Sequence, residues 1–264
     1  LYFKKHRDDE NDEYQMFFPE IEKTLAHIAE LEERVKKLEK AGTCPVCGEV
    51  VKGQDKFVCD KCKGKVFYMK EPKCAKCGKS LKEDGTLCKD CREHKHAYEK
   101  GVCLFQYAGG IKESMYRFKY KNAREYGAYY GWETAKRYGK LFEQWGIDCI
   151  MAVPVSKKKE IKRGYNQAYV YAKEISRYTK IPMDKKCLVR VEDTKPQKEF
   201  VGIARKKNVE NAFAIYEEKA KEYNKVLLVD DIYTTGSTID ACTRILKAAG
   251  VKEVYFVCIS AGVL

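Results

Sequence analysis

Eight of the 13 cysteines in this 264-residue chain are arranged in four Cys-x-x-Cys pairs. The pairs are Cys44/Cys47, Cys59/Cys62, Cys74/Cys77 and Cys88/Cys91. A Cys-x-x-Cys turn places two thiolates on the same side of the backbone, and two such turns complete a tetrahedral four-sulfur site. We therefore predict two structural zinc ions in closed sites, which leave no open coordination position for catalysis.

The spacing leaves open how the pairs combine. Pairs that follow one another in the sequence can form two successive ribbons, but a cross-braced arrangement of the first pair with the third fits the same spacing. A disulfide framework is the main alternative, and it is disfavoured because the chain shows no secretion signal. Redox chemistry would need only one such pair. Lys61, Lys76 and Lys79 lie among the cysteines and would favour their thiolate form.

A second chemically distinctive stretch follows a predicted apolar strand at residues 225–229. Two acids, four hydroxyls and a glycine fall within nine positions: Asp230, Asp231, Thr234, Thr235, Gly236, Ser237 and Thr238. Backbone N–H groups at the start of the next predicted helix, together with these hydroxyls, can bind an anion. Carboxylates at the carboxyl end of a parallel strand can accept hydrogen bonds from ribose hydroxyls. An ordinary helix N-cap would account for only one of these residues.

This stretch, Val229–Thr238, resembles the phosphoribosyl-pyrophosphate (PRPP) motif of type I phosphoribosyltransferases. From Cys44 to Leu264 the chain more narrowly resembles the ComF/ComFC family of competence proteins, which join a zinc-ribbon region to a phosphoribosyltransferase-like domain. Beside the cysteine pairs, the resemblance rests on Phe118–Lys121, Val153–Ser156, Arg163–Ala168, Thr194–Gln197, Arg205, Asn208 and Ala212–Phe213.

The resemblance implies that Asp230 and Asp231 hold the ribose hydroxyls of PRPP and that Thr234–Thr238 hold its 5-phosphate. It assigns five residues to the pyrophosphate: Val155, Ser156, Lys157, Lys158 and Arg163. The last three would lie on or beside a flexible loop, and Mg²⁺ usually accompanies PRPP. Clustered cations and Mg²⁺ stabilise the charge that develops on a leaving pyrophosphate. The lysines could equally form a solvated loop, and Arg163 could support the helix that follows.

Function is implied less sharply than fold. The resemblance links the chain to DNA uptake in natural transformation, in the cytoplasm and with a helicase-like ComFA partner. The formal net charge of +13 favours binding to single-stranded DNA, and tyrosines interleaved with cations at residues 116–130 could stack on bases. The alternatives are an active PRPP-dependent phosphoribosyltransferase in nucleotide metabolism and a zinc-ribbon scaffold without catalysis. No acceptor pocket is recognisable, so PRPP binding is better supported than transfer.

The elements that must position these residues alternate between apolar strands and helices. Strands are predicted at 105–107, 147–153, 225–229 and 254–259, and helices at 111–120, 123–139, 166–178 and 239–249. Such alternation is typical of an α/β fold with a parallel sheet. We predict a phosphoribosyltransferase-like domain over 97–264, preceded by a double zinc ribbon over 44–96.

The first 43 residues carry more acids than bases, unlike the basic remainder. A seam that is apolar except for Thr24 recurs at alternating steps of three and four: Ile21, Thr24, Ile28, Leu31, Val35 and Leu38. It predicts a helix that either packs on its own protein or self-associates through residues 19–41 as a coiled coil. No apolar run is long enough to span a membrane. The first residues show no charged segment followed by an apolar one, so nothing in the sequence argues for secretion.

Overall fold

The computed structural model describes residues 18–39, 42–51, 57–83, 85–191 and 212–262. These residues divide into two compact units: residues 18–39, 42, 50 and 51 belong to the first, and the others belong to the second. Helix α2 (Phe18–Glu39) dominates the first unit and confirms the predicted N-terminal helix. Among the helices described, not one combines the length and the apolar character that crossing a bilayer requires.

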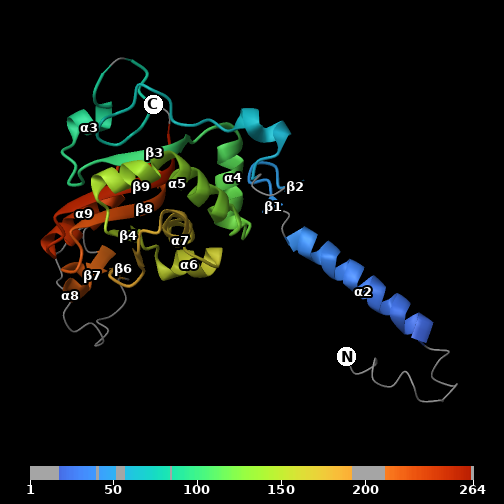
Figure 1. The fold of residues 1–264 in the computed structure, drawn as a ribbon. Helices are drawn as coiled ribbons and strands as arrows, with labels where there is room; N and C mark the ends of the chain where they lie inside the picture. Colours follow the sequence, from blue (N-terminus) through green and yellow to red (C-terminus); the bar gives the residue numbers. More distant parts are fainter. Residues whose placement is uncertain (1–17, 40–41, 52–56, 84, 192–211, 263–264) are drawn as a thin grey trace. The chain divides into compact units, whose positions relative to one another are not determined.

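A five-stranded parallel sheet forms the centre of the second unit (Figure 1). Its strands are β3 (Gly101–Gln106), β4 (Cys149–Ala152), β5 (Met183–Asp184), β8 (Lys225–Tyr233) and β9 (Glu253–Ala261). Their order across the sheet is β3-β9-β8-β4-β5, and every neighbouring pair is parallel. Strand β9 is buried along almost its whole length and β8 is buried from Val226 to Val229, because a central parallel strand is covered on both faces.

Helices cover both faces of this sheet. Helices α4 (Gly109–Tyr120), α5 (Tyr126–Trp145) and α7 (Gln167–Thr179) supply one apolar cluster, which Leu227 and Val229 of β8 join. Helix α9 (Ser237–Ala248) supplies the opposite cluster, which contains Val226 and Leu228. Successive strand residues therefore face opposite layers, as the strand period of two requires.

The cysteine-rich region is built from short elements: β1 (Gly42–Thr43), β2 (Val50–Val51), the 3₁₀ helix η1 (Asp60–Lys65) and α3 (Lys89–Glu93). Cys74, Cys77 and Cys88 belong to the apolar cluster on the α9 face. Phe57 and Tyr68 pack against the cluster on the other face. The cysteine-rich region thus contributes to both core layers of the second unit, and the boundary predicted at residues 96/97 stays a prediction.

The strands and helices predicted from the sequence are all present, although their ends differ. Strand β8 continues four residues beyond the predicted end, so that Asp230 and Asp231 lie within the strand. Beyond the cysteine-rich region, five short elements among the described residues were not predicted, because segments of two to seven residues carry too little periodicity. They are β5, α6 (Lys157–Arg163), the antiparallel pair β6 (Leu188–Arg190) and β7 (Phe213–Ile215), and α8 (Glu217–Ala220).

Candidate functional site

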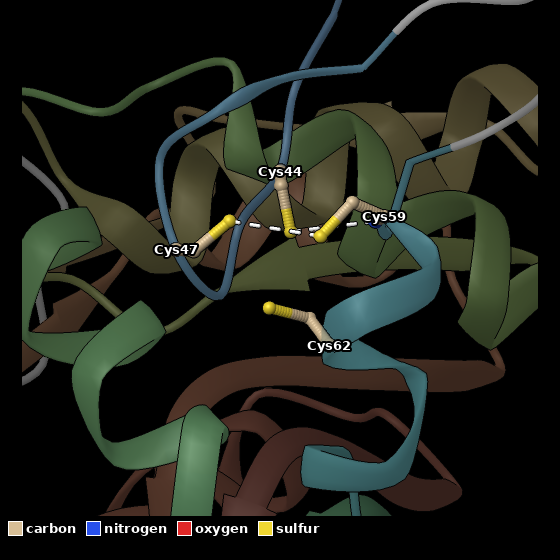
Figure 2. A group of neighbouring side chains, drawn as sticks. All are labelled: Cys44, Cys47, Cys59 and Cys62. Carbon is tan, nitrogen blue, oxygen red and sulfur yellow. Dashed lines mark hydrogen bonds between the residues drawn. The ribbon is translucent and has the colours of Figure 1, made fainter.

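The four cysteines of the first ribbon converge on one point. The sulfurs of Cys44, Cys47, Cys59 and Cys62 all lie within 4.8 Å of one another, and Figure 2 shows them turned toward a common centre. Cys44 and Cys47 come from a tight turn that Gly48 closes in the left-handed region, with φ at 82°. Cys59 and Cys62 bracket the start of η1.

The second ribbon repeats this arrangement with Cys74, Cys77, Cys88 and Cys91, whose sulfurs also lie within 4.8 Å of one another. Gly78 closes its first turn with φ at 71°, as Gly48 does in the first ribbon. Each site therefore combines consecutive pairs, and the cross-braced alternative is excluded. The sequence could not decide this, because the order of turns in space depends on the intervening backbone.

Both clusters fit zinc. A tetrahedron with Zn–S bonds of about 2.3 Å has sulfurs about 3.8 Å apart. The sulfurs of Cys47 and Cys59 are 3.7 Å apart, and so are those of Cys77 and Cys88. Burial, and then the neighbouring thiols of Cys59 and Cys47, raise the pKa of Cys62 to about 12. Four thiols this close can all ionise only around a cation, so the donor set suits a structural zinc ion.

The acidic pair lies at the carboxyl end of the central strand β8. Asp230 and Asp231 are partly buried, and the backbone N–H of Asp231 donates to Oδ1 of Asp230 at 2.8 Å. Burial, and next the negative charge of Asp231, raise the pKa of Asp230 to about 7, although Lys119 and Arg163 act in the opposite direction. The site therefore holds two carboxylates that nearby cations only partly neutralise.

Lys119 is a residue of this site to which the sequence analysis assigned no role. Its ammonium lies 3.0 Å from Oδ2 of Asp231, and both side chains are largely shielded from solvent. Lys119 is on the last turn of α4, more than 100 residues from Asp231 in the sequence. The sequence offered one indication of its role: Lys119 lies in the segment Phe118–Lys121, on which the family resemblance partly rests.

The hydroxyl-rich loop connects β8 to α9. Thr234, Thr235, Ser237 and Thr238 are exposed, and the hydroxyls of Thr235 and Ser237 lie 2.8 Å apart. Gly236 is buried with φ at 83°, and a Cβ there would lie 2.6 Å from the hydroxyl oxygen of Tyr233. The glycine is therefore required by the turn itself, in addition to the predicted approach of a phosphate. Helix α9 begins at Ser237, so its free N–H groups open onto this loop.

The residues assigned to pyrophosphate follow the neighbouring strand β4. Because Ala152 of β4 lies opposite Val229 of β8, Val155 and Ser156 lie at the same edge of the sheet as the acidic pair. Lys157, Lys158 and Arg163 lie in helix α6, where a flexible loop was expected. Ser156 forms its N-cap, since Ser156 Oγ accepts from the N–H of Lys159 at 3.4 Å. This cap stabilises the start of the helix, and Gly164 in the left-handed region ends it.

Arg163 is held in place by two contacts at the end of α6. Its Nη1 donates to Oε1 of Gln167 at 2.9 Å, and its guanidinium lies 5.4 Å from the ring centroid of Tyr120. Arg163 therefore supports the following helix α7, which was the alternative to a role in pyrophosphate binding. It also contributes positive charge near Asp230. Gln197, Arg205 and Asn208 lie outside the described residues.

Comparisons with known proteins identify both parts of the chain. Residues 41–103 match the double zinc ribbon domain, and residues 162–262 match the phosphoribosyl transferase domain. The second match agrees with the parallel sheet and its flanking helices, which form a phosphoribosyltransferase-like fold.

Three curated relatives match at least 70% of the chain. The chain is 29% identical to competence protein F of Haemophilus influenzae, over 75% of this chain and 94% of the relative. It is 27% identical to competence protein ComFC of Bacillus subtilis, over 75% and 83% respectively. It is also 24% identical to DNA utilization protein YhgH of Escherichia coli, over 70% and 88%. With two four-cysteine ribbons joined to a phosphoribosyltransferase domain, the chain is similar to the ComF/ComFC family of competence proteins.

Proposed function

We propose that the chain binds PRPP at the carboxyl edge of strands β4 and β8 and acts in DNA uptake. The observation that carries the PRPP proposal is the joint placement of Asp230 and Asp231 with the exposed hydroxyls of the loop that begins α9. Carboxylates and an anion-binding loop on adjacent residues match a ligand that has ribose hydroxyls beside a phosphate.

Each group has a distinct role in this proposal. The carboxylates of Asp230 and Asp231 accept hydrogen bonds from the ribose hydroxyls, and Thr234–Thr238 donate hydroxyl and backbone hydrogen bonds to the 5-phosphate. Lys119 orients the carboxylate of Asp231 before the ligand arrives, because its ammonium already lies 3.0 Å from Oδ2 of Asp231. Arg163 supplies positive charge on the side assigned to pyrophosphate.

Magnesium belongs to the ligand in this proposal. Within the described residues, the two cysteine clusters are the only groups of three or more His, Cys, Asp or Glu close enough to hold a metal. Mg²⁺ is usually held by one or two carboxylates together with substrate phosphates, which fits a site that offers Asp230 and Asp231. When bound, Mg²⁺ would neutralise part of the pyrophosphate charge.

Calorimetry tests the PRPP proposal. Titrations of PRPP with Mg²⁺ into the wild type and into Asp230→Asn/Asp231→Asn should show binding that the double variant loses. Inorganic phosphate should bind both proteins similarly, because its partners are in the loop. Equal PRPP affinity of the two proteins would refute the assignment of the acidic pair to ribose.

We also propose that the chain binds single-stranded DNA without sequence preference during uptake, in the cytoplasm and together with a ComFA-like helicase. Of the five tyrosines between residues 116 and 130, Tyr126, Tyr129 and Tyr130 are buried in the core, whereas Tyr116 and Tyr120 are each 50% exposed. The rings of Tyr116 and Tyr120 lie 5.3 Å apart on α4, next to the guanidinium of Arg163. Exposed aromatic rings among cations are a typical platform for stacking bases.

Fluorescence anisotropy with a labelled oligonucleotide tests the DNA proposal. Tyr116→Leu/Tyr120→Leu should weaken binding at least tenfold, since stacking contributes about 1–3 kcal/mol per base. Tyr216→Leu is a matched control, because Tyr216 is also exposed but lies at the start of α8. Log K should fall linearly with log salt, with a slope of about −0.7 per phosphate contact. Absence of binding at low salt would leave the scaffold and enzyme alternatives.

Helix α2 supports a further proposal, that two copies of the chain associate through it. Its side chains Ile21, Leu25, Ile28 and Leu31 are 40–58% exposed. β-Branched residues occupy positions 21, 28 and 35, and leucines occupy positions 31 and 38. β-Branched residues at the first core position of a heptad and leucine at the second favour a parallel two-stranded coiled coil.

A further inference from the structure

The second zinc ribbon contacts the loop that begins α9 through a buried lysine. Lys79 follows the Cys74–Cys77 turn, and its side chain is only 3% exposed. Its ammonium lies 2.5 Å from Oδ2 of Asp90, 3.5 Å from the backbone oxygen of Thr234 and 5.4 Å from the ring centroid of Tyr233. Burying an ammonium is costly unless its partners are in place. Lys79 therefore ties the ribbon to the first residue of the loop.

A histidine after the ribbon contacts the first turn of α9, directly after the same loop. Nδ1 of His96 lies 2.6 Å from Oδ2 of Asp240, and the N–H of Ala97 donates to Oδ1 of Asp240 at 2.8 Å. The N–H of Asp240 in turn donates to the backbone oxygen of Gly236 at 2.8 Å. Because the carboxylate accepts from Nδ1, that nitrogen carries the proton, and Nε2 is buried with no partner among the described residues. Within the described residues, the bond to Asp240 is thus the one hydrogen bond of this side chain.

Tyr98 completes the contact beneath the turn. Its hydroxyl lies 2.7 Å from that of Tyr233, and its ring stacks on His96 with centroids 4.9 Å apart. A Cβ at Gly236 would meet the hydroxyl oxygen of Tyr233 at 2.6 Å and Cε1 of His96 at 3.2 Å. The backbone of Gly236 therefore rests on a surface formed by Tyr233 and His96.

The first ribbon makes no comparable contact in the described part of the chain. Its turn has the same hydrogen bonds, from the N–H of Cys44 to the oxygen of Glu49 and from the N–H of Gly48 to the oxygen of Cys44. Glu49 occupies the position that corresponds to Lys79, yet it is exposed. The first ribbon instead accepts a hydrogen bond from Nη1 of Arg117, on α4, at the backbone oxygen of Val46.

We propose that Lys79, His96 and Tyr98 are positioning residues that fix residues 234–240 in the conformation that binds the phosphate of the ligand. The second ribbon is thereby part of the anion site, whereas the first ribbon is separate from it. The inference rests on the proposed function, since it assigns this loop to the 5-phosphate. A preorganised loop binds more tightly because less conformational entropy is lost when the ligand binds.

Amide hydrogen exchange of the ligand-free protein tests the positioning role independently of PRPP. In Lys79→Met and His96→Leu, peptides that cover residues 234–240 should exchange about tenfold faster than in the wild type, while the β8 and β9 peptides exchange as before. Glu49→Met, the matched change in the first ribbon, should leave the loop unaffected. Unchanged loop exchange, or a rise shared equally by the sheet or by Glu49→Met, would overturn the proposal.

A conservative replacement separates positioning from general stability. Asparagine at position 96 keeps an N–H donor for Asp240 and removes the buried unpaired Nε2. His96→Asn should therefore restore loop exchange to within about twofold of the wild type, whereas His96→Leu does not. Loss of protection in His96→Asn equal to that in His96→Leu would contradict a role for the bond to Asp240.

Ligand affinity then distinguishes the two layers of inference. If the wild type binds PRPP and Mg²⁺, Lys79→Met should bind about tenfold more weakly and Glu49→Met equally well. Full affinity of Lys79→Met would overturn the positioning role while leaving PRPP binding intact. If the wild type binds no PRPP, the proposed function fails, and hydrogen exchange still decides whether the second ribbon orders the loop.

Discussion

Replacing Asp230 with asparagine should stabilise the protein above neutral pH, although the residue lies in the proposed ligand site. Burial and the charge of Asp231 raise the pKa of Asp230 from 3.8 to about 7. A shift of this size corresponds to roughly 4 kcal/mol at 1.36 kcal/mol per pH unit. Asparagine keeps the Oδ1 that accepts from the N–H of Asp231 and removes the charge.

The sign follows from proton linkage. Because the pKa is higher in the folded state, the folded protein binds the proton more tightly, and the contribution of Asp230 to stability falls as pH rises from about 4 to about 7. Between about pH 5 and about pH 8, the free energy of unfolding of Asp230→Asn relative to the wild type should therefore grow by about 3 kcal/mol.

Urea denaturation of the ligand-free wild type and variant at the two pH values measures how their difference in free energy of unfolding changes with pH. The titration of all other groups cancels in this double difference. Asp60→Asn is the matched control, because Asp60 is exposed and pairs with Lys63 on the surface. A double difference near zero, or one of opposite sign, would refute the conclusion that ionised Asp230 destabilises the folded state. The same variant should bind PRPP more weakly, so stability and ligand affinity would change in opposite directions.

Three further predictions concern the metal sites, the turn and helix α2. Elemental analysis should find two zinc ions per chain in the wild type and in Cys242→Ser, but one in Cys59→Ser, which lacks a ligand. Disulfides detected by mass spectrometry would exclude the zinc assignment. Gly236→Val should abolish binding of both PRPP and inorganic phosphate, because φ at 83° disfavours a β-branched residue and its Cβ would meet Tyr233; calorimetry showing wild-type affinity would disprove the loop assignment. Ile28→Glu should convert a dimer to a monomer in sedimentation experiments, whereas Glu30→Lys should not, and a wild type that is monomeric at high concentration would rule out self-association through α2.

The sequence by itself determined the chemistry that is local along the chain. The two thiols of a Cys-x-x-Cys turn are close because a four-residue turn brings its first and last residues together, and the zinc ribbons follow from that spacing. The apolar runs that became β4, β8 and β9 are long enough to identify a buried parallel sheet. The acidic pair and the hydroxyl-rich loop are contiguous in sequence, so their placement at the strand end and helix start followed directly.

Only the tertiary structure decided which distant residues meet. The consecutive pairing of the cysteine turns, the ion pair of Lys119 with Asp231 and the bond of His96 to Asp240 join segments whose separation is set by how helices and ribbons pack on the sheet. The short helix α6 likewise stands where a loop was expected, and a cap at Ser156 stabilises its start. Lys79 and Glu49 occupy equivalent turns, and nothing in their local sequence distinguishes a buried ammonium from an exposed carboxylate. That difference arises because the second ribbon packs against the α9 face of the sheet, where the side chain of Lys79 has Thr234, Tyr233 and Asp90 as neighbours.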